Sequence, residues 1–463
     1  MRYAIIGAGL SGLTCATEIR RADPEATIDV YEAEDRIGGK LLTVPFESGP
    51  TDMGAEAFLA IRADATAYFE SLGLSKYLVS PSGLRSTVYS GGQLHDLPTG
   101  GVMGIPSSSA PVAHLVSADT AARIDAEGEA EAIDWQLGQD QSIGRLVRER
   151  YGDEVVDRVV SALLGGVYSC LADDLGVRAT VPQLAAALDA LAQTGEKVTL
   201  SAAVARCEAA RPQRKPEDKP APVFAGFEGG YAVVYEALAE ASEADIHLDA
   251  FITGITRELR GYRVSGGEEG LYDRVILATP APTTAMLLRA VAPEASASLK
   301  SVKLASSVVV GMKFNSDAGL PEKSGILVAA DEPEMRVKAF TLSSKKWPHL
   351  GQRGGALVRA SFGRFGQDDL VRAAEDDLVD WALDDLQKIT GFDGRDAELS
   401  EIYVQRWFGG LPRFDETHLT TVDTVRSELV EVPGLEVAGA WAGGVGVPAV
   451  IADARKAVER LLE

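Results

Sequence analysis

Hydrophobic and polar positions near the start of the chain follow a strand, helix, strand order. Tyr3-Ala4-Ile5-Ile6 is a short apolar run, Leu13 to Arg21 has its apolar residues at helical spacing, and Thr27 to Tyr31 is another apolar run. This order is typical of a βαβ unit, whose strands are parallel. The chain therefore begins as an α/β fold.

A related pattern returns in the second half of the chain. Gly229 to Ala239 predicts a helix, and Ile246 to Leu248 predicts a strand. Val264 to Thr279 predicts a hairpin whose second arm is the apolar run Arg274 to Leu277. An unbroken apolar run is typical of a parallel sheet that is buried on both faces.

The regions between these parts have other periodicities. Val112 to Ala209 is rich in alanine and leucine at helical spacing, and Val88 to Leu97 predicts a hairpin around a Gly-Gly turn. Strand-like runs from Val308 to Phe362 predict a further sheet, which a helix from Asp369 to Ile389 follows.

The glycines after the first strand predict a dinucleotide site. In Gly7-Ala8-Gly9-Leu10-Ser11-Gly12, Gly7 permits the tight turn, Gly9 lets the backbone approach a pyrophosphate, and Gly12 lets helix and strand pack closely. The helix N-terminus offers free N–H groups and its positive dipole end to the phosphates.

A further motif follows the next strand. Glu32 lies twenty residues after Gly12, where a carboxylate can accept hydrogen bonds from the adenosine ribose and disfavours a 2′-phosphate. Arg36 and Gly38-Gly39 complete a Glu-Arg-Gly-Gly signature that resembles FAD enzymes of the amine-oxidase superfamily. The two motifs together predict a pocket for FAD.

The C-terminal segment predicts a complementary part of that pocket. Val437 to Gly439 is a predicted strand end, Gly443 to Gly446 is a glycine-rich loop, and Pro448 suits the first turn of a helix over Ala449 to Leu462. A helix N-terminus aimed at the flavin pyrimidine would stabilise the negative charge of reduced flavin by up to about 2 kcal/mol.

These patterns predict an α/β protein with a Rossmann-like FAD-binding domain of discontinuous segments, a mixed-sheet substrate domain and a helical domain. The expected boundaries are 1–78, 226–292 and 430–463 for the FAD-binding domain, 79–100 and 293–429 for the substrate-binding sheet domain, 101–209 for the helical domain, and 210–225 for a linker.

Composition narrows the function. The chain has 45 basic and 68 acidic residues, a net charge of −23, so we expect no nucleic-acid partner. Three cysteines without a CxxC pair and five scattered histidines predict neither disulfides nor a metal site, and fit a cytoplasmic protein. No apolar run of about twenty residues is present, so we expect no transmembrane anchor.

Ordered matches run through nearly the whole chain. They include Leu164 to Tyr168, Arg178 to Leu184, Leu342 to Pro348, Arg406-Trp407 and Gly444 to Pro448. In these stretches the chain resembles the protoporphyrinogen and coproporphyrinogen oxidase family. The resemblance implies an FAD-dependent enzyme that oxidises a porphyrinogen with O2.

Both the motifs and the resemblance contribute to the expected site of non-covalent FAD, in which the backbone of Ile252 meets the adenine. The expected cofactor-binding residues are Gly7, Gly9, Leu10, Ser11, Gly12, Glu32, Arg36, Gly38, Gly39, Lys40, Gly54, Ala55, Glu56, Ala57, Ile252, Ala278, Trp407, Gly439, Val445, Gly446 and Val447.

The chain also departs from the family pattern. Ala440 stands where many members have an acidic or amide residue, so the flavin contact there must come from the backbone or from water. An arginine that some members use to meet a substrate carboxylate has no clean counterpart, because Ser86 lies near its position and Arg85 beside it.

The implied reaction removes six electrons from a porphyrinogen in three flavin cycles, each of which passes two electrons to dioxygen and forms hydrogen peroxide. Because the cofactor performs the hydride chemistry, we assign no side chain as catalytic acid or base. The product passes, on this interpretation, to an iron-inserting chelatase.

The acidic chain without an anchor favours coproporphyrinogen III, a substrate with four carboxylates, and coproporphyrin III as product. Expected substrate contacts are Tyr168, Arg85, Lys345 and Arg359. The alternatives are a protoporphyrinogen IX oxidase, an amine or amino-acid oxidase of the same fold, and a non-catalytic tetrapyrrole carrier.

Overall fold

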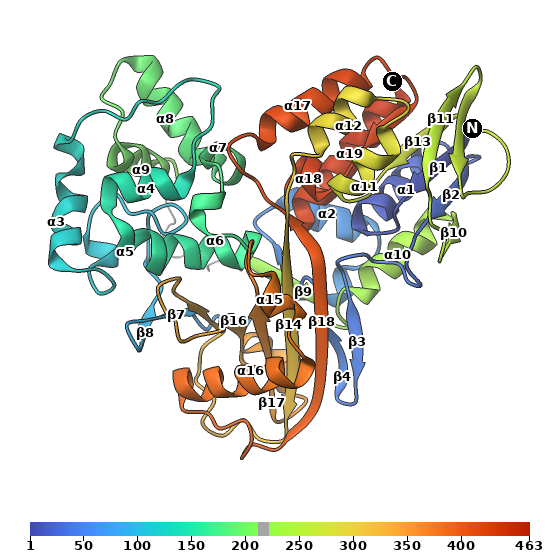
Figure 1. Ribbon diagram of the computed structural model, residues 1–463. Helices are drawn as coiled ribbons and strands as arrows, with labels where there is room; N and C mark the ends of the chain where they lie inside the picture. Colours follow the sequence, from blue (N-terminus) through green and yellow to red (C-terminus); the bar gives the residue numbers. More distant parts are fainter. Residues whose placement is uncertain (212–221) are drawn as a thin grey trace. The chain divides into compact units, whose positions relative to one another are not determined.

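The structure is a computed structural model that describes residues 1–211 and 222–463 (Figure 1). The chain forms two compact units. The first comprises Met1–Pro81, Ala221–Lys303 and Thr420–Glu463, and the second comprises Ser82–Pro220 and Leu304–Leu419. Residues 212–221 of the predicted linker lie outside the described residues, and the strand β9 begins at Phe224, inside the linker's predicted end.

A parallel sheet forms the centre of the first unit. Its strand order is β10-β2-β1-β13-β19, and each neighbouring pair is parallel. The strands are β1 (Arg2–Ile6), β2 (Thr27–Tyr31), β10 (Asp245–His247), β13 (Arg274–Leu277) and β19 (Leu435–Val437). The apolar residues of β1, β2, β13 and β19 are buried, as the unbroken hydrophobic runs predict, and Ile246 in the edge strand β10 is half-buried.

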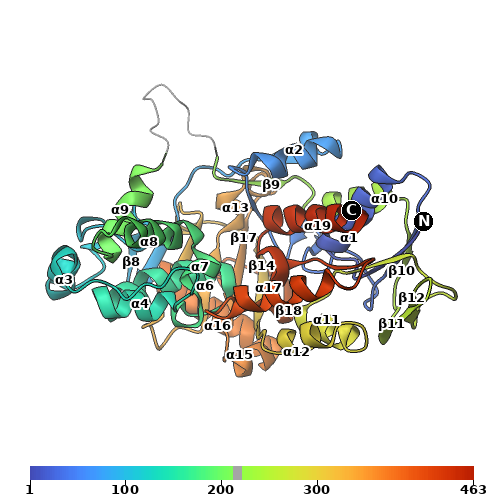
Figure 2. The ribbon, with the colours of Figure 1, turned by 90° about the horizontal axis from the view of Figure 1, so that it is seen from above.

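Helices cover this sheet, and their apolar faces form its core. The helix α1 (Leu10–Ala22) packs against α10 (Ala232–Ser242) and α19 (Val447–Leu462), and the two views show α19 beside α1 (Figures 1 and 2). The remaining elements are α2 (Ala63–Ser71), α11 (Ala281–Leu288), α12 (Pro293–Leu299), α17 (His418–Leu429), α18 (Ala440–Gly443), and the short strands β3 (Thr43–Phe46), β4 (Gly49–Asp52), β5 (Phe58–Leu59), β6 (Leu78–Val79), β9 (Phe224–Phe227), β11 (Gly254–Glu258) and β12 (Gly261–Ser265).

A mixed sheet forms the base of the second unit. Its order is β18-β14-β17-β16-β15-β7-β8, with only β15 and β7 parallel among its neighbours. The strands are β7 (Thr87–Ser90), β8 (Gln93–Asp96), β14 (Leu304–Phe314), β15 (Gly325–Val328), β16 (Val337–Thr341), β17 (Ala356–Phe362) and β18 (Leu399–Pro412). The helix α16 (Glu375–Thr390) lies along one face, and its apolar side completes that core (Figure 1).

The rest of the second unit is mostly helical. Its helices are α3 (Ala118–Ala126), α4 (Ile143–Tyr151), α5 (Asp153–Val155), the π-helix η4 (Val156–Val160), α6 (Ser161–Tyr168), α7 (Val177–Thr180), α8 (Pro182–Thr194) and α9 (Leu200–Ala209), with α13 (Ser343–Lys346), α14 (Pro348–Gly351) and α15 (Asp368–Arg372) beside the sheet. The α/β class with a parallel and a mixed sheet is confirmed. Because sheet and helices form one unit here, their division into two domains stays a prediction.

Two predicted elements are wrong in detail. The hairpin is β11–β12 rather than Val264 to Thr279. Val264 pairs with Ile255, which precedes it in the chain, and β13 joins the parallel sheet. The helix predicted from Asp369 to Ile389 is broken between α15 and α16. The Arg406 guanidinium accounts for this break, since it donates to the carbonyls of Val371 and Ala373 at the end of α15.

Candidate functional site

The carboxyl edge of the parallel sheet brings the sequence motifs of the first unit together. Gly7 follows β1, Glu32 follows β2, Ala278 follows β13, and Gly439 lies just after β19. Because these strands are parallel, their carboxyl ends meet at one edge. Open α/β sheets bind ligands in the crevice at this edge.

The glycines of the first motif differ in what constrains them. A Cβ on Gly7, whose φ is +106°, would lie 2.7 Å from the Ala278 carbonyl oxygen, and one on Gly12 would lie 1.9 Å from the Gly7 oxygen. A Cβ on Gly9 would meet its nearest atom, Gly39 Cα, at 3.7 Å. The chain itself therefore requires glycine at two positions, whereas a Cβ on Gly9 would make only an ordinary van der Waals contact.

The second motif packs on the first. The Gly38 N–H donates to the Ala8 carbonyl at 2.9 Å, and Gly9 and Gly38 form a parallel β-bridge. The Arg36 guanidinium donates to the carbonyls of Ile37, Gly39 and Leu41, at 2.6–3.3 Å. In the described chain Arg36 thus holds the diglycine loop in place, and a contact with FAD stays a prediction.

Glu32 bridges the two motifs. Its Oε2 accepts from the Ala8 N–H at 2.9 Å and its Oε1 from the Glu34 N–H at 3.0 Å. A carboxylate has about four lone-pair sites, so acceptors remain for ribose hydroxyls. The loop after β10 contacts Glu32 as well, because the Ala250 N–H donates to the Glu32 carbonyl. Ile252 is buried within this loop.

The turn after β4 lies against the second motif. A Cβ on Gly54 would lie 2.1 Å from the Lys40 carbonyl oxygen, so only glycine permits this approach. Ala55, Glu56 and Ala57 follow as half-buried residues, and the Lys40 side chain is exposed. This backbone packing keeps the turn beside the glycine motifs.

The N-terminus of α19 also lies on the carboxyl side of the sheet. Gly446, with φ +102°, caps the helix, Pro448 lies in its first turn, and the half-buried Val445 and buried Val447 flank the cap. Apart from its immediate chain neighbours, no described residue comes within 4 Å of a Cβ built on Gly439 or on Gly446. This backbone therefore leaves space that a bound group can occupy.

Sequence reasoning missed the ion pair that shapes this loop. Asp453 in α19 is 4% exposed, and it accepts from the Gly439 N–H at 3.0 Å and from Arg426 Nη2 at 2.8 Å. Burial raises the pKa of Asp453, although the Gly439 N–H and Arg426 oppose this effect. Its place among apolar positions of the C-terminal helix was the only available signal.

These features fit a dinucleotide cofactor such as FAD. Open space lies beside Gly439 and Gly446, and a Cβ on Gly9 would have one neighbour within 4 Å. Ser11 Oγ, in the first turn of α1, is buried without a hydrogen-bond partner among the described residues. Leu10 begins the same turn. Trp407 belongs to β18 in the second unit, so its contact with FAD stays a prediction.

The predicted substrate contacts lie at different ends of the second sheet. Arg359 pairs in register with Thr341 near the end of β16, Lys345 follows in α13, and the Arg85 carbonyl accepts from the Ser324 N–H just before β15. Tyr168 is the last residue of α6 and lies at the other end of β16. The next residue, Ser169, accepts a hydrogen bond from Lys338, which is near the start of that strand. The four residues therefore do not form one cluster.

Their environments also differ. Lys345 Nζ is paired with Glu322 at 2.6 Å and with Asp317 at 3.1 Å, so its charge is already neutralised. Arg359 is buried in β17, and Arg85 is exposed. Burial raises the pKa of Tyr168 to about 12, and its ring lies 5.7 Å from that of Phe414.

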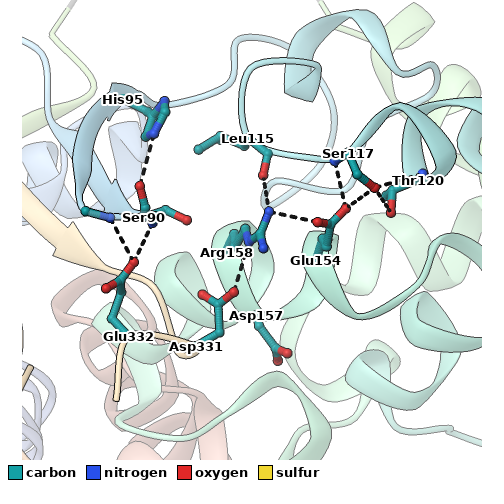
Figure 3. Close-up of polar contacts among 12 residues, drawn as sticks. Ser90, His95, Leu115, Ser117, Thr120, Glu154, Asp157, Arg158, Asp331 and Glu332 are labelled. Atoms are coloured by element: carbon teal, nitrogen blue, oxygen red, sulfur yellow. Dashed lines mark hydrogen bonds and ion pairs between the residues drawn. The ribbon is translucent and has the colours of Figure 1, made fainter. Parts of the chain in front are cut away.

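An ion-pair network anchors the helix that carries Tyr168. Arg158, in the π-helix η4 just before α6, donates to Glu154, to Asp331 and to the Leu115 carbonyl, each at 2.9 Å (Figure 3). Burial alone would raise the pKa of Glu154, but hydrogen bonds from Thr120 and Ser117 lower it to about 2. The network fixes α6 to the β15–β16 connection.

No candidate metal site accompanies these features: within residues 1–211 and 222–463, no three His, Cys, Asp or Glu side chains gather as metal ligands. Likewise, none of the helices in the described part of the chain is long and apolar enough to cross a membrane.

Comparison with known proteins agrees with the flavin-site geometry. The family model "Flavin containing amine oxidoreductase" matches residues 10–462. A coproporphyrinogen III oxidase of Mycobacterium tuberculosis is 40% identical, with 100% of this chain and 97% of the relative covered. One of Bacillus subtilis is 28% identical, with 99% and 97% covered.

The solved structures include an Exiguobacterium protein provisionally described as a protoporphyrinogen oxidase. It is 29% identical, has a TM-score of 0.84, and covers 99% of this chain and 98% of its own. Similarity thus extends over both units and is not confined to the glycine motifs. The chain belongs to the family of flavin-containing amine oxidoreductases.

Proposed function

We propose that this chain oxidises coproporphyrinogen III to coproporphyrin III with non-covalently bound FAD. Six electrons and six hydrogens leave the substrate, and three O2 are reduced to three H2O2. The observation that carries the proposal is the 40% identity over the full chain to relatives named coproporphyrinogen III oxidase. It rests on a cofactor cradle whose glycines leave space for a dinucleotide.

Bound FAD would accept hydride equivalents from the substrate and return electrons to dioxygen. On this proposal the turn from Gly7 to Gly12 and the start of α1 bind the pyrophosphate, and Glu32 orients the ribose. The N-terminus of the 16-residue helix α19 would lie near the flavin, where its dipole would stabilise negative charge by up to about 2 kcal/mol.

Non-covalent attachment is supported by the positions of the cysteines. Cys15 and Cys170 are buried free thiols, and Cys207 is the last cysteine of the chain. The C-terminal half therefore has no thiol for a thioether to flavin. Delivery of the product to an iron-inserting chelatase and a cytoplasmic location stay predictions.

Aerobic turnover tests the substrate. Purified FAD-loaded protein is given coproporphyrinogen III and protoporphyrinogen IX separately, and porphyrin fluorescence is followed together with peroxide. We expect a strong preference for the tetracarboxylate. Activity with protoporphyrinogen IX alone would contradict the proposal and indicate the activity for which the Exiguobacterium relative is named.

The same assay distinguishes a porphyrinogen oxidase from a tetrapyrrole carrier and from an amine oxidase. Porphyrinogen binding without peroxide would indicate a tetrapyrrole carrier. Peroxide from amines or amino acids, with neither porphyrinogen oxidised, would indicate an amine oxidase. Either result contradicts the proposal.

A further inference from the structure

Two cationic side chains lie beside the end of α6 without an ion-pair partner among the described residues. Lys338 in β16 is 6% exposed, and its Nζ donates to Ser169 Oγ and to the Gly363 carbonyl, both at 2.6 Å. Both acceptors are neutral. A buried ammonium ion without a counter-ion is costly, because the hydrogen bonds replace only part of its hydration.

Arg364 is the second cation. It follows β17 directly after Gly363, is half-buried, and donates from Nη2 to the Val328 carbonyl at 3.3 Å. Its buried Nε has no hydrogen-bond partner in the part of the chain that the structure describes. A guanidinium has five N–H donors, so this one contact leaves most of its hydrogen-bonding capacity for a ligand.

The nearby acids are used elsewhere. Asp415 is 2.7 Å from Arg413 and Asp174 is 3.9 Å from it. Arg148 in the same unit pairs with three aspartates, Asp153, Asp157 and Asp173. In a chain of net charge −23, acids are abundant, and their absence beside Lys338 and Arg364 leaves a local positive charge.

The surface next to these cations is aromatic. Tyr168 packs against Phe414, and the Arg413 guanidinium lies 4.5 Å from the centre of the Phe365 ring. The Phe365 N–H also donates to the Ser169 carbonyl at 2.7 Å, which ties the loop after β17 to the end of α6. Aromatic rings beside unneutralised cations suit a large ring system that carries carboxylates.

Gly165 in α6 lies beside the Arg364 guanidinium. A Cβ built on Gly165 would lie 3.7 Å from Arg364 Nε and 3.3 Å from the Cys170 carbonyl oxygen. The end of α6, the loop after β17 and β16 thus converge on one point.

We propose that Arg364 binds a propionate carboxylate of the porphyrinogen, and that Lys338 is a positioning residue which holds Ser169 and the loop after β17 around it. This inference rests on the proposed function, because it takes the tetracarboxylate as the ligand. Arg364 was absent from the residues predicted from the sequence, and it gives the substrate an anchor at the end of the sheet opposite to Lys345.

The charge state of Lys338 is consistent with an anion site. Burial and, to a smaller extent, the charge of Arg364 after β17 lower the pKa of Lys338 to about 7, and Cys170 after α6 partly opposes them. A carboxylate bound at Arg364 would favour the protonated lysine. Substrate binding should therefore be accompanied by proton uptake somewhat above pH 7.

Arg364→Gln tests the proposal in the FAD-loaded full chain, with Arg364→Lys as the conservative variant. The matched control is Arg395→Gln, which removes the same charge from a half-exposed arginine paired with Asp380 and Asp384. KM and kcat for coproporphyrinogen III are measured, together with the Kd of coproporphyrin III, which needs no turnover. Lys338→Met is followed from pH 6 to pH 9.

We expect Arg364→Gln to raise KM and Kd by roughly tenfold or more with kcat nearly unchanged, as for loss of a charged hydrogen bond. Arg364→Lys should recover part of this loss, and Lys338→Met should remove the pH dependence of KM near pH 7. If Arg364→Gln does not fold, as judged by circular dichroism and flavin absorbance, the KM and Kd of Arg364→Lys decide the question.

Unchanged KM and Kd in the Arg364 variants, with an active wild type, overturn this inference and leave the proposed function intact. A wild-type chain that neither oxidises coproporphyrinogen III nor binds coproporphyrin III overturns the proposed function, and this inference with it.

Discussion

Replacing Gly9 and Gly12 by alanine separates the demands of the fold from those of the cofactor. A Cβ on Gly12 would lie 1.9 Å from the Gly7 carbonyl oxygen, far inside van der Waals contact. The helix α1 must then move away from the turn, and overpacking of this kind costs about 1–3 kcal/mol. Gly12→Ala should therefore destabilise the protein whether or not FAD is bound.

Gly9→Ala should act differently. Gly9 has φ −75° and ψ −177°, which alanine adopts, and the nearest atom to its Cβ would be 3.7 Å away. The free energy of unfolding without FAD should change by less than about 1 kcal/mol. The methyl group would enter the space proposed for the pyrophosphate, and loss of one charged hydrogen bond would weaken FAD binding by roughly 10- to 150-fold.

The assay combines urea unfolding of the FAD-free protein with titration of FAD by flavin fluorescence. Gly128→Ala is the control, because its Cβ would meet Ser201 Oγ at 3.9 Å and Gly128 belongs to the second unit, whereas the glycine motifs belong to the first. If Gly9→Ala binds FAD as tightly as Gly128→Ala does, or if Gly12→Ala is as stable as wild type, the steric reasoning is refuted.

Three further predictions concern the cofactor and two ion-pair networks. When the protein is unfolded in urea and passed through a filter that retains the chain, all flavin should appear in the filtrate. Flavin that stays with the chain would contradict non-covalent binding. Burial alone would raise the pKa of Asp29, but hydrogen bonds from His247, Tyr272 and Arg2 outweigh burial and lower it, so the ionised carboxylate stabilises the fold above about pH 4 and this stabilisation is lost as pH falls. Asp29→Asn should therefore flatten the decline of stability between about pH 4 and pH 2. An unaltered slope would refute this. Arg158→Leu should lower the free energy of unfolding by about 1 kcal/mol, since its pairs with Glu154 and Asp331 are partly exposed, and identical urea curves would show that the network does not contribute.

Local sequence patterns predicted the parts of the fold that depend on neighbouring residues. The β1–α1–β2 unit follows from apolar runs and glycines within the first segment, and Pro448 marks the start of α19. The break between α15 and α16 could not be predicted in this way, because its stabilising donor, Arg406, lies in β18.

The candidate site shows the same division. Gly12 and Gly38 were recognisable because each lies against a carbonyl only a few residues away, that of Gly7 and that of Leu41 respectively. Lys338 was not recognisable, because it lies between apolar residues in Val337–Thr341, as a solvent-facing residue of a strand would. The end of α6 and the loop after β17 contact it in the folded chain. Burial of this kind depends on segments distant in sequence.

Anaerobic mixing shows whether FAD bound to this chain oxidises coproporphyrinogen III. FAD-loaded protein is mixed with the substrate without oxygen while flavin absorbance is followed, and oxygen is then admitted. We expect bleaching of the flavin on mixing, and afterwards three peroxides for each coproporphyrin III formed. A flavin that stays oxidised in the presence of the substrate would contradict it.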